Sequence, residues 1–199
     1  MRVALTFDVE HPSREHHNLN GSDSILAVLE RAEIAATFFV QGRWATAYPD
    51  HARRIDQAGH LVGHHSHFHA PMTLLGDPGI RADIEEGAES IARIVGRDPR
   101  PWFRCPFGDG HNDPRVLDAL SRAGCTNVHW DVDSNDWRGT STASEMASEV
   151  VDGIRHHGDG AVVLFHSWPV ATPEAISRIV GSLRDEGATF VTVDSLVAA

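Results

Sequence analysis

The segment "GHLVGHHSHFHA", residues 59–70, is rich in side chains that bind metals. It carries five histidines: His60, His64, His65, His67 and His69. His65 and His69 are four residues apart, so one helical turn would place both on the same face. In an extended segment, His65, His67 and His69 would instead share one side. The segment therefore predicts a divalent-metal site, most plausibly for Zn²⁺, with Co²⁺, Ni²⁺ and Mn²⁺ as alternatives.

Two carboxylates in "TFDVE", near the amino terminus, could complete that site. Side chains at i and i+2 of an extended segment point to the same side, so Asp8 and Glu10 can face one site while Val9 packs behind it. Either carboxylate could join His65 and His69 as a metal ligand, leaving one position open for water. With Glu10 as the ligand, Asp8 would remain available for proton transfer. In the competing arrangement, Asp8 is the ligand and Glu10 a solvated loop residue.

Three further segments place polar side chains directly after apolar runs. "FRCPFG" contains Arg104, "DVDSNDW" contains Asp133 and Asp136, and "VVLFHSWP" contains His166. Taken alone, they fit a solvated arginine in a turn, a polar loop and a capping histidine. A histidine at the end of an apolar strand is also where a general acid would stand.

The elements that would position these residues alternate regularly along the chain. Apolar, β-branched runs predict strands, and helical patterns lie between them. Three helices are expected to begin with a capping residue followed by proline, at Asp77, Asp113 and Thr172. Several should end at glycines such as Gly59, Gly124 and Gly187. The predicted strands are Val3–Phe7, Ala36–Val40, Leu61–Gly63, Trp102–Arg104, Thr126–Val128, Ala161–Phe165 and Thr189–Val193.

Seven strands alternating with helices predict a parallel α/β sheet, either open and doubly wound or closed as a barrel. The polar residues above follow strand ends, so they should gather at the carboxyl end of the sheet, where such folds keep their active sites. No glycine-rich phosphate loop follows the first strand, which weakens a nucleotide-binding interpretation. The 199 residues fit a single domain, residues 1–199.

The composition argues against some classes of binding partner. The net charge of −11 argues against nucleic acid, and no apolar run is long enough for a membrane helix. The two cysteines are too few for a disulfide framework. The sequence begins "MRVALTFDVE" and lacks the apolar core of a secretory signal, so we expect a cytoplasmic protein, or a secreted one if a leader has been removed.

Five motifs, in order along nearly the whole chain, resemble those of the polysaccharide deacetylase (NodB-homology) family of carbohydrate esterases. "TFDVE" resembles the family's first motif, usually Thr-Phe-Asp-Asp, and "HSHFH" matches its His-(Ser/Thr)-x-x-His metal motif. "RCPF" is similar to Arg-x-Pro-(Tyr/Phe), "SNDW" to the aspartate–tryptophan motif, and "LFH" to the final leucine–histidine motif. The resemblance implies a distorted (β/α)₇ barrel, and it implies metal-dependent removal of N-acetyl groups from amino sugars or their polymers.

The resemblance also assigns roles. His65 and His69 would hold the metal, Asp8 would take a proton from water, and Arg104 would keep Asp8 ionised. With Asp8 as the base, we expect Glu10 to be the third metal ligand, in the place that Val9 leaves empty. His166 would protonate the departing amine, oriented by Asp136 or by Asp133. The backbone amide of Phe107 would help to hold the oxyanion, and Trp137 and Leu164 would enclose the acetyl methyl group.

Some positions depart from the family pattern, and two alternatives stay open. Val9 replaces the second aspartate, Cys105 the usual proline, and Ser167 an aspartate that often follows the histidine. The chain could instead resemble the family's cyclic amide and imide hydrolases, such as allantoinase, or be a barrel that binds metal or sugar without turnover. A cytoplasmic location favours a soluble N-acetyl sugar, precursor or oligosaccharide over an extracellular polymer.

Overall fold

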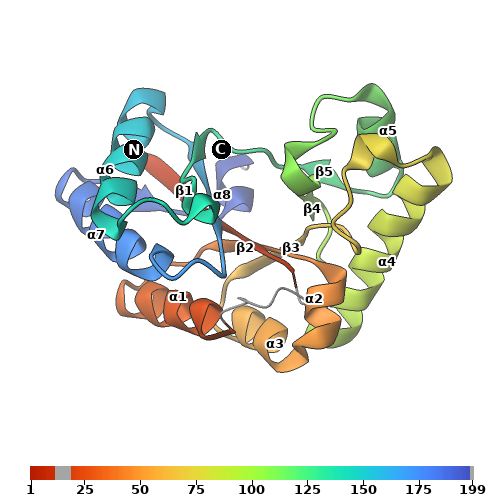
Figure 1. The fold of residues 1–199 in the computed structure, drawn as a ribbon, viewed down its shortest axis with the longest axis horizontal. Helices are drawn as coiled ribbons and strands as arrows, with labels where there is room; N and C mark the ends of the chain where they lie inside the picture. Colours follow the sequence, from red (N-terminus) through yellow and green to blue (C-terminus); the bar gives the residue numbers. More distant parts are fainter. Residues whose placement is uncertain (12–18, 198–199) are drawn as a thin grey trace.

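The computed structural model describes residues 1–11 and 19–197, which form a parallel sheet surrounded by helices (Figure 1). The strands run in the order β5-β4-β3-β2-β1-β7-β6, and β8 pairs with β1 beside this path. The ends of the path, β5 and β6, are not paired with each other within the described residues, so the barrel is open there. The strands are β1 (Arg2–Val9), β2 (Thr37–Val40), β3 (Leu61–His64), β4 (Trp102–Phe103), β5 (Thr126–Asn127), β6 (Val132–Asp133), β7 (Ala161–His166) and β8 (Thr189–Phe190).

The helices pack around this sheet, with α1, α2 and α3 gathered on one side and α4 and α5 at the opposite end from α6 and α7 (Figure 1). They are α1 (Leu19–Arg31), α2 (Gly42–Ala47), α3 (Pro49–Gln57), α4 (Asp77–Val95), α5 (Pro114–Arg122), α6 (Ala143–His157), α7 (Thr172–Asp185) and α8 (Val193–Val197). Three short 3-10 helices, η1 (Met72–Leu74), η2 (Pro106–Gly108) and η3 (Asp136–Arg138), lie in the loops. The predicted distorted α/β barrel is confirmed.

The central strand β1 is buried along almost its whole length because it has neighbours on both sides and helices over its faces. Its apolar side chains enter the largest core cluster, where Phe7 stacks between Phe38 and Phe165 at ring-centroid distances of 4.8 and 5.6 Å. Val9 is fully buried in the same cluster. Burial on this scale is the main stabilising term of such a sheet, and it fixes the direction in which the neighbouring polar residues of β1 point.

The parallel register aligns the ends of the strands. Val9 pairs with Val40, Val40 with His64, and His64 with Phe103, so these four residues form one row across the sheet. The residues that follow this row on β1, β3 and β4 are Glu10, His65 and Arg104. On the other side of β1, Asp8 pairs with His166 of β7. The convergence expected from strand ends is therefore a consequence of register.

Three details differ from the sequence-based expectation. A two-residue strand, β6, lies in the acidic segment predicted as a loop, where Val132 pairs with Val163 of β7. The last predicted strand is only Thr189–Phe190, because α8 begins at Val193. Of the three predicted helix caps, only Asp113 accepts backbone hydrogen bonds as an N-cap, whereas α4 and α7 begin one residue earlier than expected, with Gly76 and Ala171 as N-caps.

Among the residues that the structure describes, no helix combines the length and the apolarity required to cross a membrane.

Candidate metal centre and catalytic site

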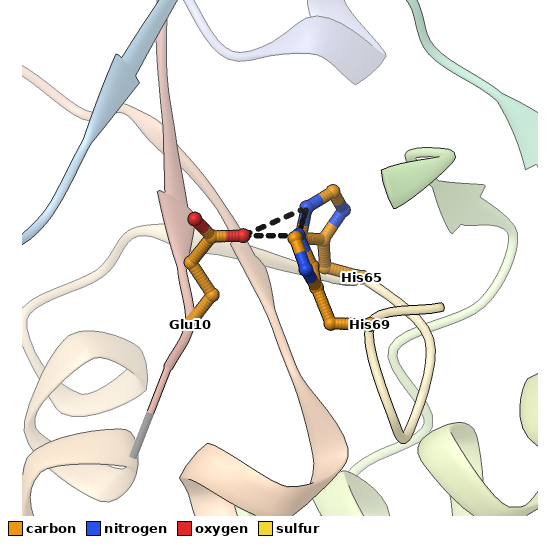
Figure 2. Close-up of side chains that lie close together, drawn as sticks. All are labelled: Glu10, His65 and His69. Carbon is orange, nitrogen blue, oxygen red and sulfur yellow. Dashed lines mark hydrogen bonds and ion pairs between the residues drawn. The ribbon is translucent and has the colours of Figure 1, made fainter. Parts of the chain in front are cut away.

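Glu10, His65 and His69 form a cluster of potential metal ligands at the carboxyl end of the sheet (Figure 2). One ligand atom from each residue lies within 4.8 Å of the other two. The His65 and His69 Nε2 atoms are 3.1 Å apart, Glu10 Oε2 is 3.4 Å from His65 Nε2, and the same oxygen is in close contact with His69 Nε2. Two imidazoles and a carboxylate that converge in this way fit a divalent cation such as Zn²⁺.

The orientation of His65 is fixed by a hydrogen bond at the ring nitrogen that does not face the cluster. Its Nδ1 lies 2.8 Å from the carbonyl oxygen of Arg104, and because a carbonyl only accepts, Nδ1 must donate. In the neutral ring, Nε2 then carries the lone pair that points toward His69 and Glu10. A ligating histidine is usually held in this way through its second ring nitrogen. This contact ties the metal cluster to the residue that follows β4.

The loop that carries His65 and His69 is not helical, which corrects the expectation from their spacing. Ser66 and His69 have positive φ values of 59° and 60°, so the chain turns sharply between the two histidines. The α4 side chain of Asp83 holds this turn, because its Oδ1 accepts hydrogen bonds from the amides of His67 and Phe68 at 3.0 and 2.7 Å. The loop geometry thus depends on a long-range contact.

The three other histidines of the segment lie outside the cluster. His60 Nδ1 is 3.2 Å from the amide nitrogen of Ala36. His64 is completely buried beside Cys125, and burial lowers its pKa to about 3. His67 lies near Ser90 and Glu86 of α4, so the extended alternative with His67 as a ligand does not describe this loop.

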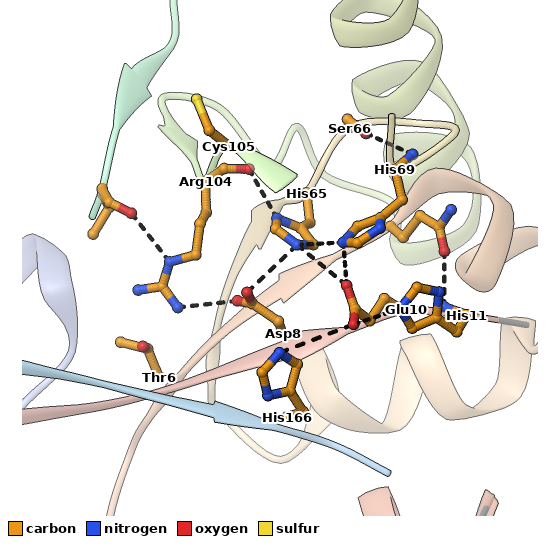
Figure 3. A network of polar contacts seen from close by, with 12 residues as sticks. Thr6, Asp8, Glu10, His11, His65, Ser66, His69, Arg104, Cys105 and His166 are labelled. Atoms are coloured by element: carbon orange, nitrogen blue, oxygen red, sulfur yellow. Dashed lines mark hydrogen bonds and ion pairs between the residues drawn. The ribbon is translucent and has the colours of Figure 1, made fainter. Parts of the chain in front are cut away.

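Asp8 lies beside the cluster but has a different principal partner (Figure 3). Arg104 donates a hydrogen bond of 3.0 Å from Nη1 to Asp8 Oδ1, while Asp8 Oδ2 is 3.4 Å from His65 Nε2. The Arg104 guanidinium is fully buried, packs 4.1 Å from the centroid of the Phe39 ring, and donates from Nε to the carbonyl of Val128. Burial lowers the pKa of Arg104, and the Asp8 carboxylate offsets part of that effect.

Glu10 is the carboxylate that the imidazoles surround. Burial alone would raise its pKa, but hydrogen bonds with His11, His65 and His69 hold the pKa well below its usual range. Asp8 and Glu10 do face the same site with Val9 behind them, as the alternation along an extended strand predicts. Asp8 is not part of the ligand cluster, so the geometry favours Glu10 as the third ligand.

His166, at the end of β7, forms a second buried acid–histidine pair. Its Nδ1 is 2.7 Å from Asp136 Oδ1, and its backbone amide donates to Asp136 Oδ2 at 2.8 Å. The Thr172 hydroxyl also donates to Asp136 Oδ2, at 2.8 Å, which is the role it has instead of the predicted helix cap. Burial lowers the pKa of His166, but the contact with Asp136 outweighs burial and raises the pKa to about 9. Asp136 and not Asp133 is therefore the partner of His166.

Asp8, His166 and the three residues of the cluster line one cavity of about 430 Å³. Phe107, Trp137 and Leu164 also line it, and the Phe107 ring lies with its centroid 4.4 Å from that of His69 in an edge-on arrangement. Phe107 has a positive φ of 59° in η2, which places its backbone in a left-handed turn at the cavity edge. Three further lining residues were not predicted from the sequence: His11, Trp130 and Trp168. Only His11 carried a signal, its position next to Glu10.

The chain is similar in sequence and in fold to known proteins. Residues 1–128 match the family model described as "Polysaccharide deacetylase". A peptidoglycan-N-acetylglucosamine deacetylase from Bacillus cereus is 30% identical over 98% of the chain and 67% of its own length. A family 4 acetyl xylan esterase from Clostridium thermocellum, solved with a cobalt ion, is 28% identical with a TM-score of 0.86 over the whole of this chain and 91% of that one.

A family 4 pseudoenzyme from Bacillus anthracis is also similar, with 26% identity and a TM-score of 0.87 over 98% of this chain and 64% of that one. The fold alone therefore does not distinguish active from inactive members of the family. The difference must come from the side chains of the site. The family match, the relatives and the barrel all agree, and the chain belongs to the polysaccharide deacetylase family of carbohydrate esterases, a family of hydrolases.

Proposed function

We propose that this protein is a divalent-metal-dependent hydrolase that removes N-acetyl groups from acetylated amino sugars or from their oligomers and polymers. One observation carries the proposal: a single cavity joins the Glu10–His65–His69 cluster to two further polar pairs. These pairs are Asp8 with Arg104 and His166 with Asp136. The first pair has the chemistry of a base and the second that of an acid, and Asp8 and His166 both line the cavity beside the cluster.

Glu10, His65 and His69 would hold the cation, most plausibly Zn²⁺. When bound, such a cation lowers the pKa of a water ligand toward about 7 and polarises a carbonyl. Asp8 is the proton acceptor, because Arg104 occupies its Oδ1 and its Oδ2 faces the cluster. The hydrogen bond from the buried guanidinium fixes the direction of the carboxylate, which a general base requires.

His166 supplies the proton that the departing amine requires. Its raised pKa, about 9, keeps the imidazole protonated near neutral pH. Asp136 fixes Nδ1, and the free end of the ring, Nε2, faces the site at 3.9 Å from Glu10 Oε1. Water adds to the amide carbon and gives a proton to Asp8; when the tetrahedral adduct collapses, the C–N bond breaks and the amine leaves with the proton from Nε2.

The remaining predicted residues would position the acetyl group. The backbone amide of Phe107, in its left-handed turn, would donate to the developing oxyanion. Trp137 and Leu164 line the same cavity and would enclose the methyl group. Acetyl is small, so a pocket closed by an indole and a leucine suits it better than it suits a longer acyl chain.

Two alternatives make different predictions. A cyclic imide or allantoin hydrolase would open a ring and release no acetate, and a binding protein would turn over neither substrate. Asp8, Arg104 and His166 are all present, which supports catalysis, because an inert binder has no use for a base and an acid. The Bacillus cereus relative acts on peptidoglycan by its name. For this chain, such a polymer and a soluble acetylated sugar are both predicted substrates.

A substrate panel tests the proposal. The purified chain is incubated with N-acetylglucosamine oligomers, with peptidoglycan fragments, and with allantoin and cyclic imides, each with and without a chelator. We expect acetate release from an acetylated sugar, loss of that release after chelation, and recovery when Zn²⁺ is added back. Ring opening without acetate release would support the imide hydrolase, and metal binding without any product would support the binding protein.

A further inference from the structure

The two oxygens of the Glu10 carboxylate have different surroundings (Figure 3). Oε2 is the oxygen that faces the two imidazoles, with His65 Nε2 at 3.4 Å and His69 Nε2 in close contact. Oε1 points away from them and lies 2.8 Å from Nε2 of His11. Since the carboxylate is almost fully buried, its orientation is set by these protein contacts and not by bulk water.

His11 is itself held firmly in place. Its backbone has a positive φ of 60°, which is unusual for a residue with a side chain. The backbone amide donates to the Gln41 Oε1 atom at 3.0 Å, and the buried Gln41 is joined in turn to β1 by a hydrogen bond from its amide to the carbonyl of Val9. The His11 ring lies edge-on to His69, with centroids 4.7 Å apart. A strained backbone that its surroundings maintain often marks a functional constraint.

We propose that His11 is a positioning residue that holds Glu10 so that only Oε2 is available to the metal. A carboxylate with both oxygens free can bind a cation through either one or both of them. With Oε1 occupied by His11, Glu10 supplies a single ligand atom, and one more position stays open for water and substrate. This inference rests on the proposed function only in taking Glu10 as a ligand.

The contact between His11 and Glu10 also keeps His166, the proposed acid, from binding to Glu10. His166 Nε2 is 3.9 Å from Glu10 Oε1, the oxygen that His11 already engages. Without His11, a short movement would bring His166 Nε2 into a hydrogen bond with Oε1, and that bond would turn Nε2 away from the leaving group. His11 thus separates the metal ligand from the proton donor, and its loss should affect turnover as well as metal affinity.

The test measures Zn²⁺ affinity by competition with a chelator, using the full chain and the variants His11→Phe, His11→Gln and His156→Phe. His156 is an exposed residue of α6 and serves as the matched control. Partners of metal ligands typically change affinity by about 10- to 100-fold when removed. We therefore expect His11→Phe to weaken Zn²⁺ binding by roughly that factor with one ion still bound at saturation. His11→Gln, whose amide can donate to Oε1, should recover most of the loss, and His156→Phe should bind like the unaltered protein.

Affinity within twofold of the unaltered protein in His11→Phe would overturn the proposal. Complete loss of zinc at saturating concentration, as in Glu10→Gln, would also overturn it, because His11 would then be a ligand itself. If His11→Phe does not fold, Gln41→Met, which removes the acceptor of the His11 amide, should show a smaller weakening in the same direction, and unchanged affinity there would contradict the proposal. Retention of zinc by Glu10→Gln would instead refute Glu10 as a ligand. Failure of the proposed function in this respect is therefore distinguishable from failure of the proposal for His11.

Discussion

Two carboxylates separated by one residue have different partners, and on that ground we propose different functions for them. Asp8 is paired with a buried guanidinium, whereas Glu10 is surrounded by imidazoles. The strand between them directs both side chains into the site and directs Val9 into the core. Glutamate also has one methylene more than aspartate, which lets it reach the histidines from one position further along the chain.

His166 provides a prediction at this scale. His166→Ala removes the proton donor, so the turnover number should fall roughly a hundredfold or more. His166 is on β7 and is not in the ligand cluster, so metal content should stay unchanged. Acetate release and metal analysis on the same preparation measure both quantities. Loss of metal in this variant would show that His166 is a ligand and would contradict the assignment.

The sequence predicted the placement of the site residues where a local rule applied. Alternation along an extended segment places Asp8 and Glu10 together, and strand ends place Arg104 and His166 nearby. The partners of these residues could not be predicted, because they come from distant elements. The choice of Asp136 over Asp133 and the contact from Thr172 depend on how η3 and α7 pack on β7.

At the scale of elements, α4 determines the shape of the metal-binding loop. Besides the hydrogen bonds from Asp83, the helix approaches the loop closely at Gly87, where an added Cβ would lie 2.8 Å from the carbonyl carbon of Ser66. The amide of Gly42 at the start of α2 holds the Ser66 carbonyl at 2.9 Å. Position 87 therefore requires a glycine, because the gap between α4 and the loop is too narrow for a Cβ atom.

A matched pair of substitutions tests this packing. Gly87→Ala should push the loop away from α4, weaken metal binding and lower the free energy of unfolding by roughly 1–3 kcal/mol, as expected for overpacking. Gly181→Ala, in the middle of α7, meets no atom within 4 Å and should stabilise the protein by about 0.5–1 kcal/mol with unchanged metal affinity. Chemical denaturation and metal titration measure both effects. Normal zinc affinity in Gly87→Ala would contradict the role of this contact in shaping the loop.

Elements were predictable from the sequence to the extent that their residues carry a strong pattern. The seven apolar runs all contain strands, and α5 begins at its predicted cap, Asp113. β6 was missed because two residues hold no periodicity and pairing with β7 alone defines them. The histidine spacing suggested a helix, but Asp83 and α4 impose a turn, which is a long-range effect that local spacing does not contain.

At the scale of the whole molecule, the position of β1 in the centre of the sheet brings the proposed acid, base and metal ligands together. β7 lies on one side with His166, and β2, β3 and β4 follow on the other with His65 and Arg104 near their ends. The parallel register places these strand ends level with one another. An antiparallel arrangement would place the same residues at opposite edges.

The His166–Asp136 pair also predicts how stability depends on pH in the metal-free protein. The pKa of His166 is raised from 6.5 to about 9 in the folded state. A raised histidine pKa contributes stability that is fully present below the unfolded value and is lost as the pH rises through the folded value. The free energy of unfolding should therefore decrease between these two values, and Asp136→Asn should reduce this dependence. Urea denaturation in the presence of chelator across this range is the measurement, with Asp118→Asn as an exposed control; an unchanged slope in Asp136→Asn would contradict the pair's role.

Metal analysis of Asp8→Asn and Glu10→Gln, combined with acetate release, tests the central claim most directly. Both substitutions remove a charge and keep the shape of the side chain, and both residues are almost fully buried in one cavity. Asp8→Asn should retain bound metal and lose activity, because it removes the base. Glu10→Gln should lose bound metal, and its activity should be lost with the metal. Loss of metal in Asp8→Asn together with retention in Glu10→Gln would show that Asp8 is the ligand, and it would contradict the division of roles between the two carboxylates.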